Sequence, residues 1–280
     1  MIVDAHQHFW SLQRPDYTWL TPELAPLYRD YLPQDLQPLL AASGVQQTVL
    51  VQAAASEAET RYLCELAGQC GFVAGIVGWV DMACDDFAVR LEALRNSAAG
   101  RLKGIRPMLQ DLDDDAWVAA PGLDGAFETL AQSTLAFDAL VFPRHLPWLQ
   151  QRLERTPELR VVIDHAAKPP IARGEIDSWR YALAPLAQRE GVYCKLSGLL
   201  TEAGPDWHPA QVRPFIDCVL DLFGTERVLW GSDWPVVNLT ADYQSWFELA
   251  RECLAGHGPS AMDRVFGGNA RLFYRLAQGD

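Results

Sequence analysis

The sequence predicts an α/β protein that folds as one (β/α)8 barrel over residues 1–280. Eight short apolar runs follow one another along the chain, and a helical pattern comes after each. The runs are mostly continuous rather than alternating, as expected for parallel strands that are covered on both faces. The 280-residue length is also close to the roughly 250 residues typical of this barrel.

The predicted elements alternate in a regular order. The strand-like runs are residues 2–9, 47–53, 72–80, 102–109, 135–141, 160–167, 192–199 and 227–235. The helical patterns are residues 35–44, 56–71, 85–97, 123–133, 146–157, 176–190 and 209–224, with two closing helices at 243–256 and 260–276. Ser56 is a suitable helix N-cap, and Gly44 is of the type favoured just past a helix end. The long segment from Trp10 to Pro33 predicts a binding loop.

An open, doubly wound sheet is the competing architecture for such a pattern. It usually places a glycine-rich turn after an early strand. The first run instead ends in His-Gln-His-Phe-Trp, and we find no linker or internal repeat that divides the chain. The closed barrel is therefore the favoured prediction.

Composition excludes several classes of function. The net charge of −13 argues against nucleic-acid binding, because a polyphosphate backbone repels such a protein. No run approaches the ~18 apolar residues of a membrane span, and Asp4 and two histidines interrupt what a signal peptide would need. The six cysteines include no Cys-x-x-Cys pair, which favours reduced thiols and a cytoplasmic location.

Polar side chains end three of the predicted strands. His6 and His8 are two residues apart on the first strand, so their imidazoles leave the same face. His165 ends the sixth strand and Asp233 ends the eighth. Since a barrel of this type has its active site at the carboxyl ends of its strands, we expect these four side chains to meet there. Asp4 shares the parity of His6 but lies deeper, and we expect it to be structural.

The sequence resembles the amidohydrolase superfamily, and within it the sugar-lactone hydrolases similar to L-fuconolactonase and L-rhamnonolactonase. The matching motifs are DAHQHFW, YTWL, LKGIRP, VIDHAAKPP, YCKLSGL, VLWGSDWPV and VFGGNARLFY, which lie between residues 4 and 274. The resemblance implies a TIM barrel of the metal-dependent hydrolase type. It also implies that an activated water opens a cyclic sugar lactone (an aldonolactone) to the free sugar acid.

By match to this family, His6, His8, His165 and Asp233 form the central site. Family members with two metal ions commonly add a bridging lysine from the fourth strand and one histidine from each of the fifth and sixth strands. This chain has Lys103 on its fourth strand, three residues before Arg106, but no histidine on the fifth, residues 135–141. We therefore expect one divalent ion, with zinc favoured, held by these four residues. A metal-free mechanism is the alternative. Asp233 is the expected general base, and His165, a metal ion held by the histidines, or Arg106 is expected to stabilise the carbonyl oxygen.

Substrate contacts are expected from Arg106, Trp10 and Trp19. Arg106 and Lys103 are three apart on the fourth strand, so at most one of them faces the barrel interior, and Arg106 lies nearer the active-site end. The two tryptophans are on the first loop and offer flat partners for the C–H faces of a sugar. Lys195 is a further cation that could face inward. Ion pairing and loop packing are the alternative interpretations of these residues.

Two other functions remain open from the sequence. One is hydrolysis of a carboxylated lactone of the pyrone or muconolactone type, which would require two or more cations in the pocket. The other is a barrel that binds a sugar acid without turning it over. By strand parity Asp164 is out of phase with His165 and is not expected among the ligands. We expect a small-molecule sugar lactone as the partner, no nucleic acid or membrane, and a monomer or homodimer.

Overall fold

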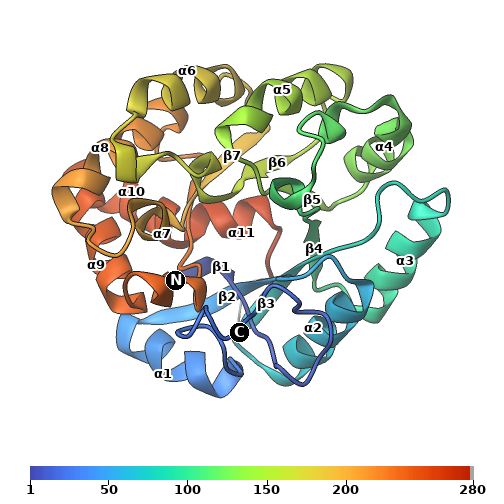
Figure 1. Ribbon diagram of the computed structural model, residues 1–280, viewed down its shortest axis with the longest axis horizontal. Helices are drawn as coiled ribbons and strands as arrows, with labels where there is room; N and C mark the ends of the chain where they lie inside the picture. The colour runs from blue at the N-terminus through green and yellow to red at the C-terminus, as the bar shows by residue number, and fades with distance from the viewer. Residues whose placement is uncertain (278–280) are drawn as a thin grey trace.

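Eight parallel strands form a barrel in the computed structural model, which describes residues 1–277 (Figure 1). They pair in the order of the sequence, so the predicted architecture is confirmed. The strands are β1 (Ile2–Gln7), β2 (Val45–Val51), β3 (Val73–Gly78), β4 (Leu102–Ile105), β5 (Ala136–Ala139), β6 (Val161–Ile163), β7 (Val192–Leu196) and β8 (Val228–Trp230).

Backbone contacts between β1 and the segment after β8 close the barrel. The amide of His8 donates to the carbonyl of Trp234 at 2.7 Å, and the amide of Asp233 donates to the carbonyl of His6 at 2.8 Å. Gln7 and Trp234 form a parallel bridge at the same place. The seam that joins the two ends of the sheet therefore carries three of the four predicted site residues.

Helices surround the barrel, and the chain passes from one to the next around the ring in Figure 1. They are α1 (Pro33–Ser43), α2 (Glu57–Gln69), α3 (Phe87–Ser97), α4 (Asp124–Gln132), α5 (Leu146–Arg155), α6 (Ile176–Ala187), α7 (Leu199–Ala203), α8 (Pro209–Phe223), α9 (Tyr243–Leu254), α10 (Pro259–Asp263) and α11 (Asn269–Phe273). Ser56 caps α2 by accepting from the amide of Glu59, and Gly44 ends α1 in the left-handed conformation with φ 66°, as predicted.

Two helical segments differ from the prediction. The short helix α7 follows β7 directly and was not predicted, because its five residues are too few to show a periodic pattern. The expected closing helix at 260–276 is divided into α10, a π-helical turn at Arg264–Gly268, and α11. Each of the three pieces is only five residues long, which is too short for its limits to show in the apolar spacing.

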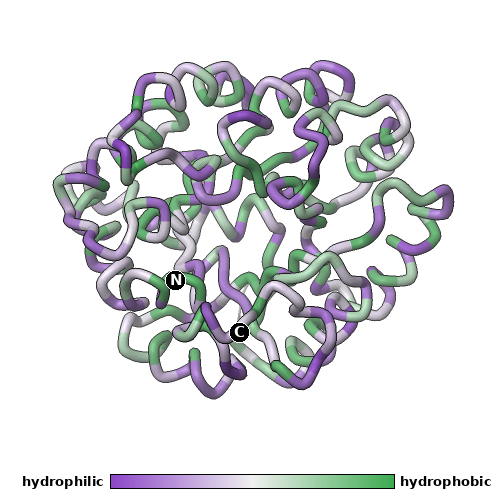
Figure 2. The backbone as a smooth tube through the Cα atoms, in the orientation of Figure 1, coloured by the Kyte–Doolittle hydropathy of each residue, from purple (hydrophilic) through white to green (hydrophobic). Residues whose placement is uncertain are grey.

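The apolar residues form an outer and an inner cluster. The outer one lies between the strands and the helix ring, and in Figure 2 hydrophilic residues lie mainly on the outer turns of the helices. The inner one joins side chains of several strands, such as Val49 and Val162, to Phe273 and Tyr274 at the end of the chain. The inner cluster fills one end of the barrel, so polar chemistry is confined to the other.

Candidate active site

A shift in register within β1 places His6, near the end of the strand, in the barrel interior. The pairing with β2 moves out of step between Asp4 and Gln7, which is the signature of a β-bulge. Asp4 consequently faces outward and accepts from the hydroxyl of Tyr243 on α9 at 3.1 Å, whereas His6 faces inward. The structural role expected for Asp4 is confirmed, but its shared parity with His6 is not, because the bulge adds a residue between them.

The chain adopts the left-handed conformation shortly after β6 and again at Asp233 after β8, where φ is 57°. β6 ends at Ile163, and φ is 53° at His165, 50° at Ala166, 60° at Ala167 and 51° at Lys168. Strand parity therefore stops before Asp164, and both Asp164 and His165 reach the interior; this corrects the expectation that the two are out of phase. In a turn of this kind residues three apart lie on one face, which places Lys168 beside His165.

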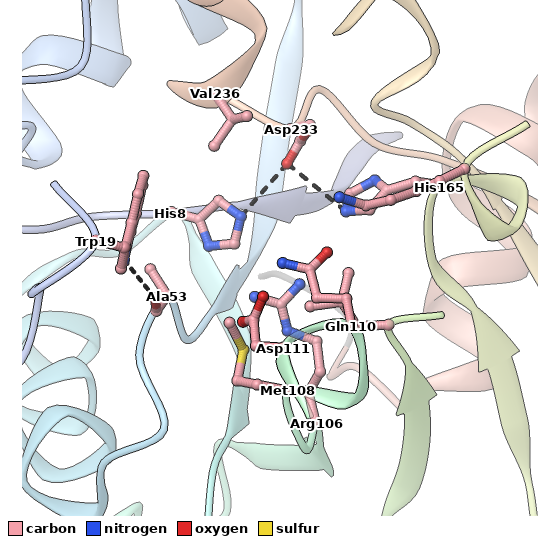
Figure 3. Close-up of a pocket in the computed structure, with 12 residues that line it drawn as sticks. His8, Trp19, Ala53, Arg106, Met108, Gln110, Asp111, His165, Asp233 and Val236 are labelled. Atoms are coloured by element: carbon pink, nitrogen blue, oxygen red, sulfur yellow. Dashed lines mark hydrogen bonds and ion pairs between the residues drawn. The ribbon is translucent and has the colours of Figure 1, made fainter. Parts of the chain in front are cut away.

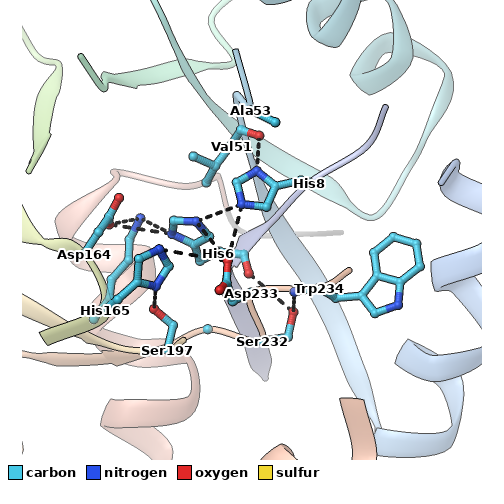
Figure 4. A network of polar contacts seen from close by, with 12 residues as sticks. His6, His8, Val51, Ala53, Asp164, His165, Ser197, Ser232, Asp233 and Trp234 are labelled. Atoms are coloured by element: carbon cyan, nitrogen blue, oxygen red, sulfur yellow. Dashed lines mark hydrogen bonds and ion pairs between the residues drawn. The ribbon is translucent and has the colours of Figure 1, made fainter. Parts of the chain in front are cut away.

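The four predicted residues meet at the carboxyl ends of the strands (Figures 3 and 4). One carboxylate oxygen, Asp233 Oδ1, lies 3.7 Å from His6 Nε2, 3.4 Å from His8 Nε2 and 3.9 Å from His165 Nε2. One donor atom from each of His6, His165 and Asp233 lies within 4.8 Å of the others. Two imidazoles and a carboxylate are a donor set that a metal ion such as zinc accepts. The predicted convergence is thus confirmed.

Two glycines make room for the imidazoles. A Cβ at Gly198 would lie 2.7 Å from His165 Nδ1, and one at Gly231 would lie 2.7 Å from His6 Cβ. Both distances are below van der Waals contact, so any side chain there would displace a histidine ring. These glycines, which follow β7 and β8, are therefore part of the site.

The charge state of the cluster follows from its burial. Burial lowers the pKa of His165 to about 4, against the opposing effect of Asp233. Burial and the Lys195 ammonium lower the pKa of His6 well below its usual value. Burial alone would raise the pKa of Asp233, but His165, a hydrogen bond with His8 and the nearby His6 hold it below its usual range. At neutral pH the site therefore presents an ionised Asp233 carboxylate beside the neutral imidazoles of His6 and His165.

Beneath the cluster lies a buried ion network centred on Lys195. Its Nζ is 2.6 Å from Asp138 Oδ2, 2.9 Å from Asp164 Oδ1 and 3.1 Å from His6 Nδ1. All of these residues are fully buried, and Tyr274 donates to Asp138 at 2.5 Å. The sequence left Lys195 as one possibility among several, and nothing local pointed to Asp138. Their pairing depends on contacts between β5, β6 and β7 that only the closed barrel creates.

Arg106 faces the interior, as its position near the end of β4 predicts. Its Nη1 lies 3.4 Å from Asp164 Oδ2, and its Nη2 donates to Gln52 Oε1 at 3.1 Å and also contacts the Gln52 carbonyl. Its Nε is buried and has no hydrogen-bond partner among the described residues. Lys103 faces the opposite way and donates to the carbonyl of Arg275 at 3.3 Å. The guanidinium is therefore fixed in place with one donor still available.

A cavity of about 260 Å³ opens above the cluster (Figure 3). His8, His165, Asp233, Arg106, Trp19 and Lys168 are among the residues that line it. Trp10 is fully buried, and its ring packs edge-on against Trp19 with the ring centroids 5.3 Å apart. The substrate contact expected of Trp10 is therefore corrected. Trp10 instead supports Trp19 from behind, and its indole N–H donates to the Arg29 carbonyl at 2.9 Å.

A buried carboxylate holds the loop that follows β2. Glu59 accepts hydrogen bonds from the amides of Ala53 and Ala54, each at 2.8 Å. The Trp19 indole N–H donates to the carbonyl of Ala53, also at 2.8 Å, so Glu59 positions one wall of the cavity. Burial raises the pKa of Glu59 to about 7. The sequence did not indicate this role, because Glu59 lies in the first turn of α2, where glutamate is common anyway.

The amidohydrolase family profile matches residues 3–276 of the chain. The chain belongs to the amidohydrolase family. It is 49% identical over 278 residues to L-fucono-1,5-lactonase of Burkholderia ambifaria, covering 98% of this chain and 95% of that protein. It is 37% identical to L-fucono-1,5-lactonase of Burkholderia multivorans, covering 99% and 96%. The family predicted from the motifs is therefore confirmed.

Solved structures agree with this membership. An amidohydrolase from Burkholderia multivorans with bound zinc is 36% identical and superposes with a TM-score of 0.92, covering 99% of this chain and all of that one. A 2-pyrone-4,6-dicarboxylic acid hydrolase from Pseudomonas putida superposes with a TM-score of 0.77 at 22% identity, which shows a common fold. Among the described residues, every helix is too short or too polar to cross a bilayer.

Proposed function

We propose that this protein hydrolyses a sugar lactone to the free sugar acid, with Asp233 as the general base. The observation that carries the proposal is the Asp233 carboxylate in the wall of a small cavity, with one oxygen 3.4–3.9 Å from a nitrogen of each of three imidazoles. The two relatives named L-fucono-1,5-lactonase support it, since they match almost the full chain. A sugar-sized ring in the cavity would lie against Trp19.

The proposed reaction begins with water between Asp233 and the lactone carbonyl. As the water oxygen bonds to the carbonyl carbon, its proton passes to the Asp233 carboxylate and the carbonyl π electrons move to oxygen. The tetrahedral adduct then collapses, the bond between the carbonyl carbon and the ring oxygen breaks, and the ring oxygen takes the proton back from Asp233. The product is the open-chain acid, and Asp233 is again ionised.

Negative charge on the carbonyl oxygen requires donors that are already in place. The Arg106 guanidinium is buried, lines the cavity, and has its Nε unused by the protein. His165 lies on the other side of Asp233, where Ser197 Oγ is 2.9 Å from its Nδ1 and fixes the ring. We assign oxyanion stabilisation to Arg106, joined by His165 when the Nε2 of His165 holds no metal ion.

One divalent ion, with zinc the first choice, is the cofactor that we propose for this donor set. His6, His165 and Asp233 would hold it, with His8 adjacent, and their residue types fit zinc. When bound, such an ion polarises the carbonyl and lowers the pKa of bound water. The proton transfer to Asp233 and the contact of Arg106 with the carbonyl oxygen use protein groups only, and neither step is routed through the ion.

A carboxylated lactone is the second candidate, because two cations line the cavity. Both are already paired, Arg106 with Asp164 at 3.4 Å and Lys168 with Glu202 at 3.9 Å. The pocket wall is therefore close to neutral where a dicarboxylate would need excess positive charge. This balance favours an uncharged polyhydroxy ring.

Acid release from a panel of lactones tests the proposal. A pH-indicator assay would compare L-fuconolactone and L-rhamnonolactone with 2-pyrone-4,6-dicarboxylate. We expect turnover of sugar lactones, and a loss of at least 100-fold in kcat for Asp233→Asn with the fold intact, since a positioned base contributes about 10²–10⁴-fold. Asp221→Asn, on the exposed side of α8, is the matched control. Binding of sugar acids with no acid release from any lactone would refute hydrolysis and indicate a binding barrel.

A further inference from the structure

Lys195 lies between two carboxylates and the His6 ring. It donates to Asp138 Oδ2 at 2.6 Å, and His6 Nδ1 is its second hydrogen-bond partner at 3.1 Å. Asp164 Oδ1 is 2.9 Å away as an ion-pair partner without hydrogen-bond geometry. Two carboxylates so close require the charged ammonium, which can donate but cannot accept. A proton on His6 Nδ1 would therefore point at another donor. The contact is favourable only if Nδ1 carries its lone pair.

Asp164 and Arg106 also approach the His6 ring, and neither alters this assignment; Asp233 Oδ1, 3.7 Å from Nε2, is an acceptor and agrees with it. Asp164 Oδ1 is 3.6 Å from Nδ1, which is too long for a hydrogen bond. Arg106 Nη1 is 3.4 Å from Nε2, at the outer limit of a hydrogen bond, and it has Asp164 Oδ2 as its own acceptor. The contact with Lys195 is the shorter one, so the single proton of His6 belongs on Nε2.

The neighbouring histidine completes a consistent chain of donors (Figure 4). His8 Nδ1 is 2.8 Å from the carbonyl oxygen of Val51, which can only accept, so the proton of His8 is on Nδ1. Its Nε2 therefore has a free lone pair, and His6 Nε2 lies 3.2 Å from it. Each donor from Lys195 through His6 and His8 to Val51 thus meets an acceptor.

We propose that Lys195 is a positioning residue that fixes the proton of His6 on Nε2, making His6 a hydrogen-bond donor and weakening metal binding at this site. A metal ligand needs a lone pair on Nε2, so His6 could bind zinc only with its proton on Nδ1. Asp164 Oδ1 forms an ion pair with Lys195 but accepts no hydrogen bond from the described residues, and it lies 3.6 Å from His6 Nδ1. If Lys195 were absent, a small approach of the two side chains would let this oxygen accept a proton from Nδ1. Only the activity part of the inference rests on the proposed lactonase function.

The histidine tautomers of the metal-free wild-type protein provide the direct test. Protein labelled with ¹⁵N-histidine would be measured by NMR, and the signals of His6 would be assigned from their loss in His6→Asn. We expect His6 with a protonated Nε2 and an unprotonated Nδ1, and the opposite pattern for His8. A protonated Nδ1 on His6 would overturn the proposal, whatever the catalytic activity proves to be.

Replacement of Lys195 should change zinc binding and catalysis in opposite directions. Lys195→Met would be combined with Asp138→Asn so that the carboxylate is not left alone, and folding would be checked by circular dichroism. We expect zinc, titrated by calorimetry, to bind about tenfold more tightly. We also expect kcat on a sugar lactone to fall at least tenfold with little change in KM, and the His6 proton to move to Nδ1.

The matched control is Lys103→Met, because Lys103 faces away from the site and should leave all three readouts unchanged. A merely structural role for Lys195 would weaken zinc binding and catalysis together, and that result would refute the proposal. If no lactone is hydrolysed by the wild-type protein, the proposed function fails, while the zinc titration and the NMR pattern still decide the role of Lys195. If the double variant does not fold, the wild-type NMR pattern decides it alone.

Discussion

Gly198→Ala should separate the catalytic role of His165 from its contribution to stability. Gly198 has φ 65°, and an added Cβ would lie 2.7 Å from Nδ1 and 2.9 Å from Cγ of His165. Two costs follow. An alanine in the left-handed conformation destabilises the fold by about 1–2 kcal/mol. The imidazole must also move by several tenths of an ångström, away from its contact with Ser197 Oγ.

Gly44→Ala is the matched control for the first cost. Gly44 has nearly the same φ, 66°, with no atom within 4 Å of the added Cβ, and it lies between α1 and β2. Both variants should lower the melting temperature by a few degrees, since ~1 kcal/mol corresponds to about 2–4 °C in a chain of this size class. Only Gly198→Ala should lower kcat/KM on a sugar lactone, by about 10- to 100-fold.

Differential scanning calorimetry and the pH-indicator assay measure the two effects separately. Activity of Gly198→Ala within twofold of wild type would refute the claim that the ring position of His165 matters. An equal loss of activity in Gly44→Ala would show that backbone strain, rather than the contact with His165, is responsible.

Two further predictions concern the wall of the cavity. Because the pKa of Glu59 is raised from 4.5 to about 7, its contribution to stability is present below pH 4.5 and is lost as the pH rises to 7. Urea unfolding between pH 5 and 8 should therefore show a loss of up to ~3 kcal/mol in wild type that Glu59→Gln lacks, and parallel pH profiles would contradict this. Trp19→Ala should raise KM for a sugar lactone about 2- to 10-fold with a smaller effect on kcat, as expected for a lost ring contact. Trp148→Ala, at an exposed position on α5, should change neither constant; an unchanged KM in Trp19→Ala would remove Trp19 from the substrate site.

The barrel was predictable because each strand and each helix has a recognisable pattern within its own stretch of sequence. Continuous apolar runs and amphipathic segments reflect burial on one or both faces, which depends little on distant parts of the chain. His6 and His8 were placed correctly relative to each other, and both approach the same oxygen of Asp233. The bulge itself, which turned Asp4 outward, depends on pairing with β2 and left no local signal.

The rest of the site depends on features that strand periodicity does not describe. Asp164 was expected to face away from His165, yet the left-handed turn after Ile163 turns it inward. Its expected absence from the ligand set agrees with the metal-capable group, which is His6, His165 and Asp233. The sequence left the inward orientation of Lys195 as one possibility among several, because its partners Asp138, Asp164 and His6 come from other strands. Trp10 was expected at the substrate and lies behind Trp19, because aromatic residues in one loop cannot be sorted into wall and support without the packing of that loop.

The four consecutive left-handed residues from His165 to Lys168 also have a consequence for protein engineering. Each non-glycine residue in that conformation carries about 1–2 kcal/mol of unfavourable energy, and two of them are alanines, Ala166 and Ala167. Glycine at either alanine would relieve this energy while loosening the segment that aims His165. Selection for heat resistance alone would therefore favour glycine and a less firmly positioned His165 side chain, whereas selection for turnover would retain the alanines.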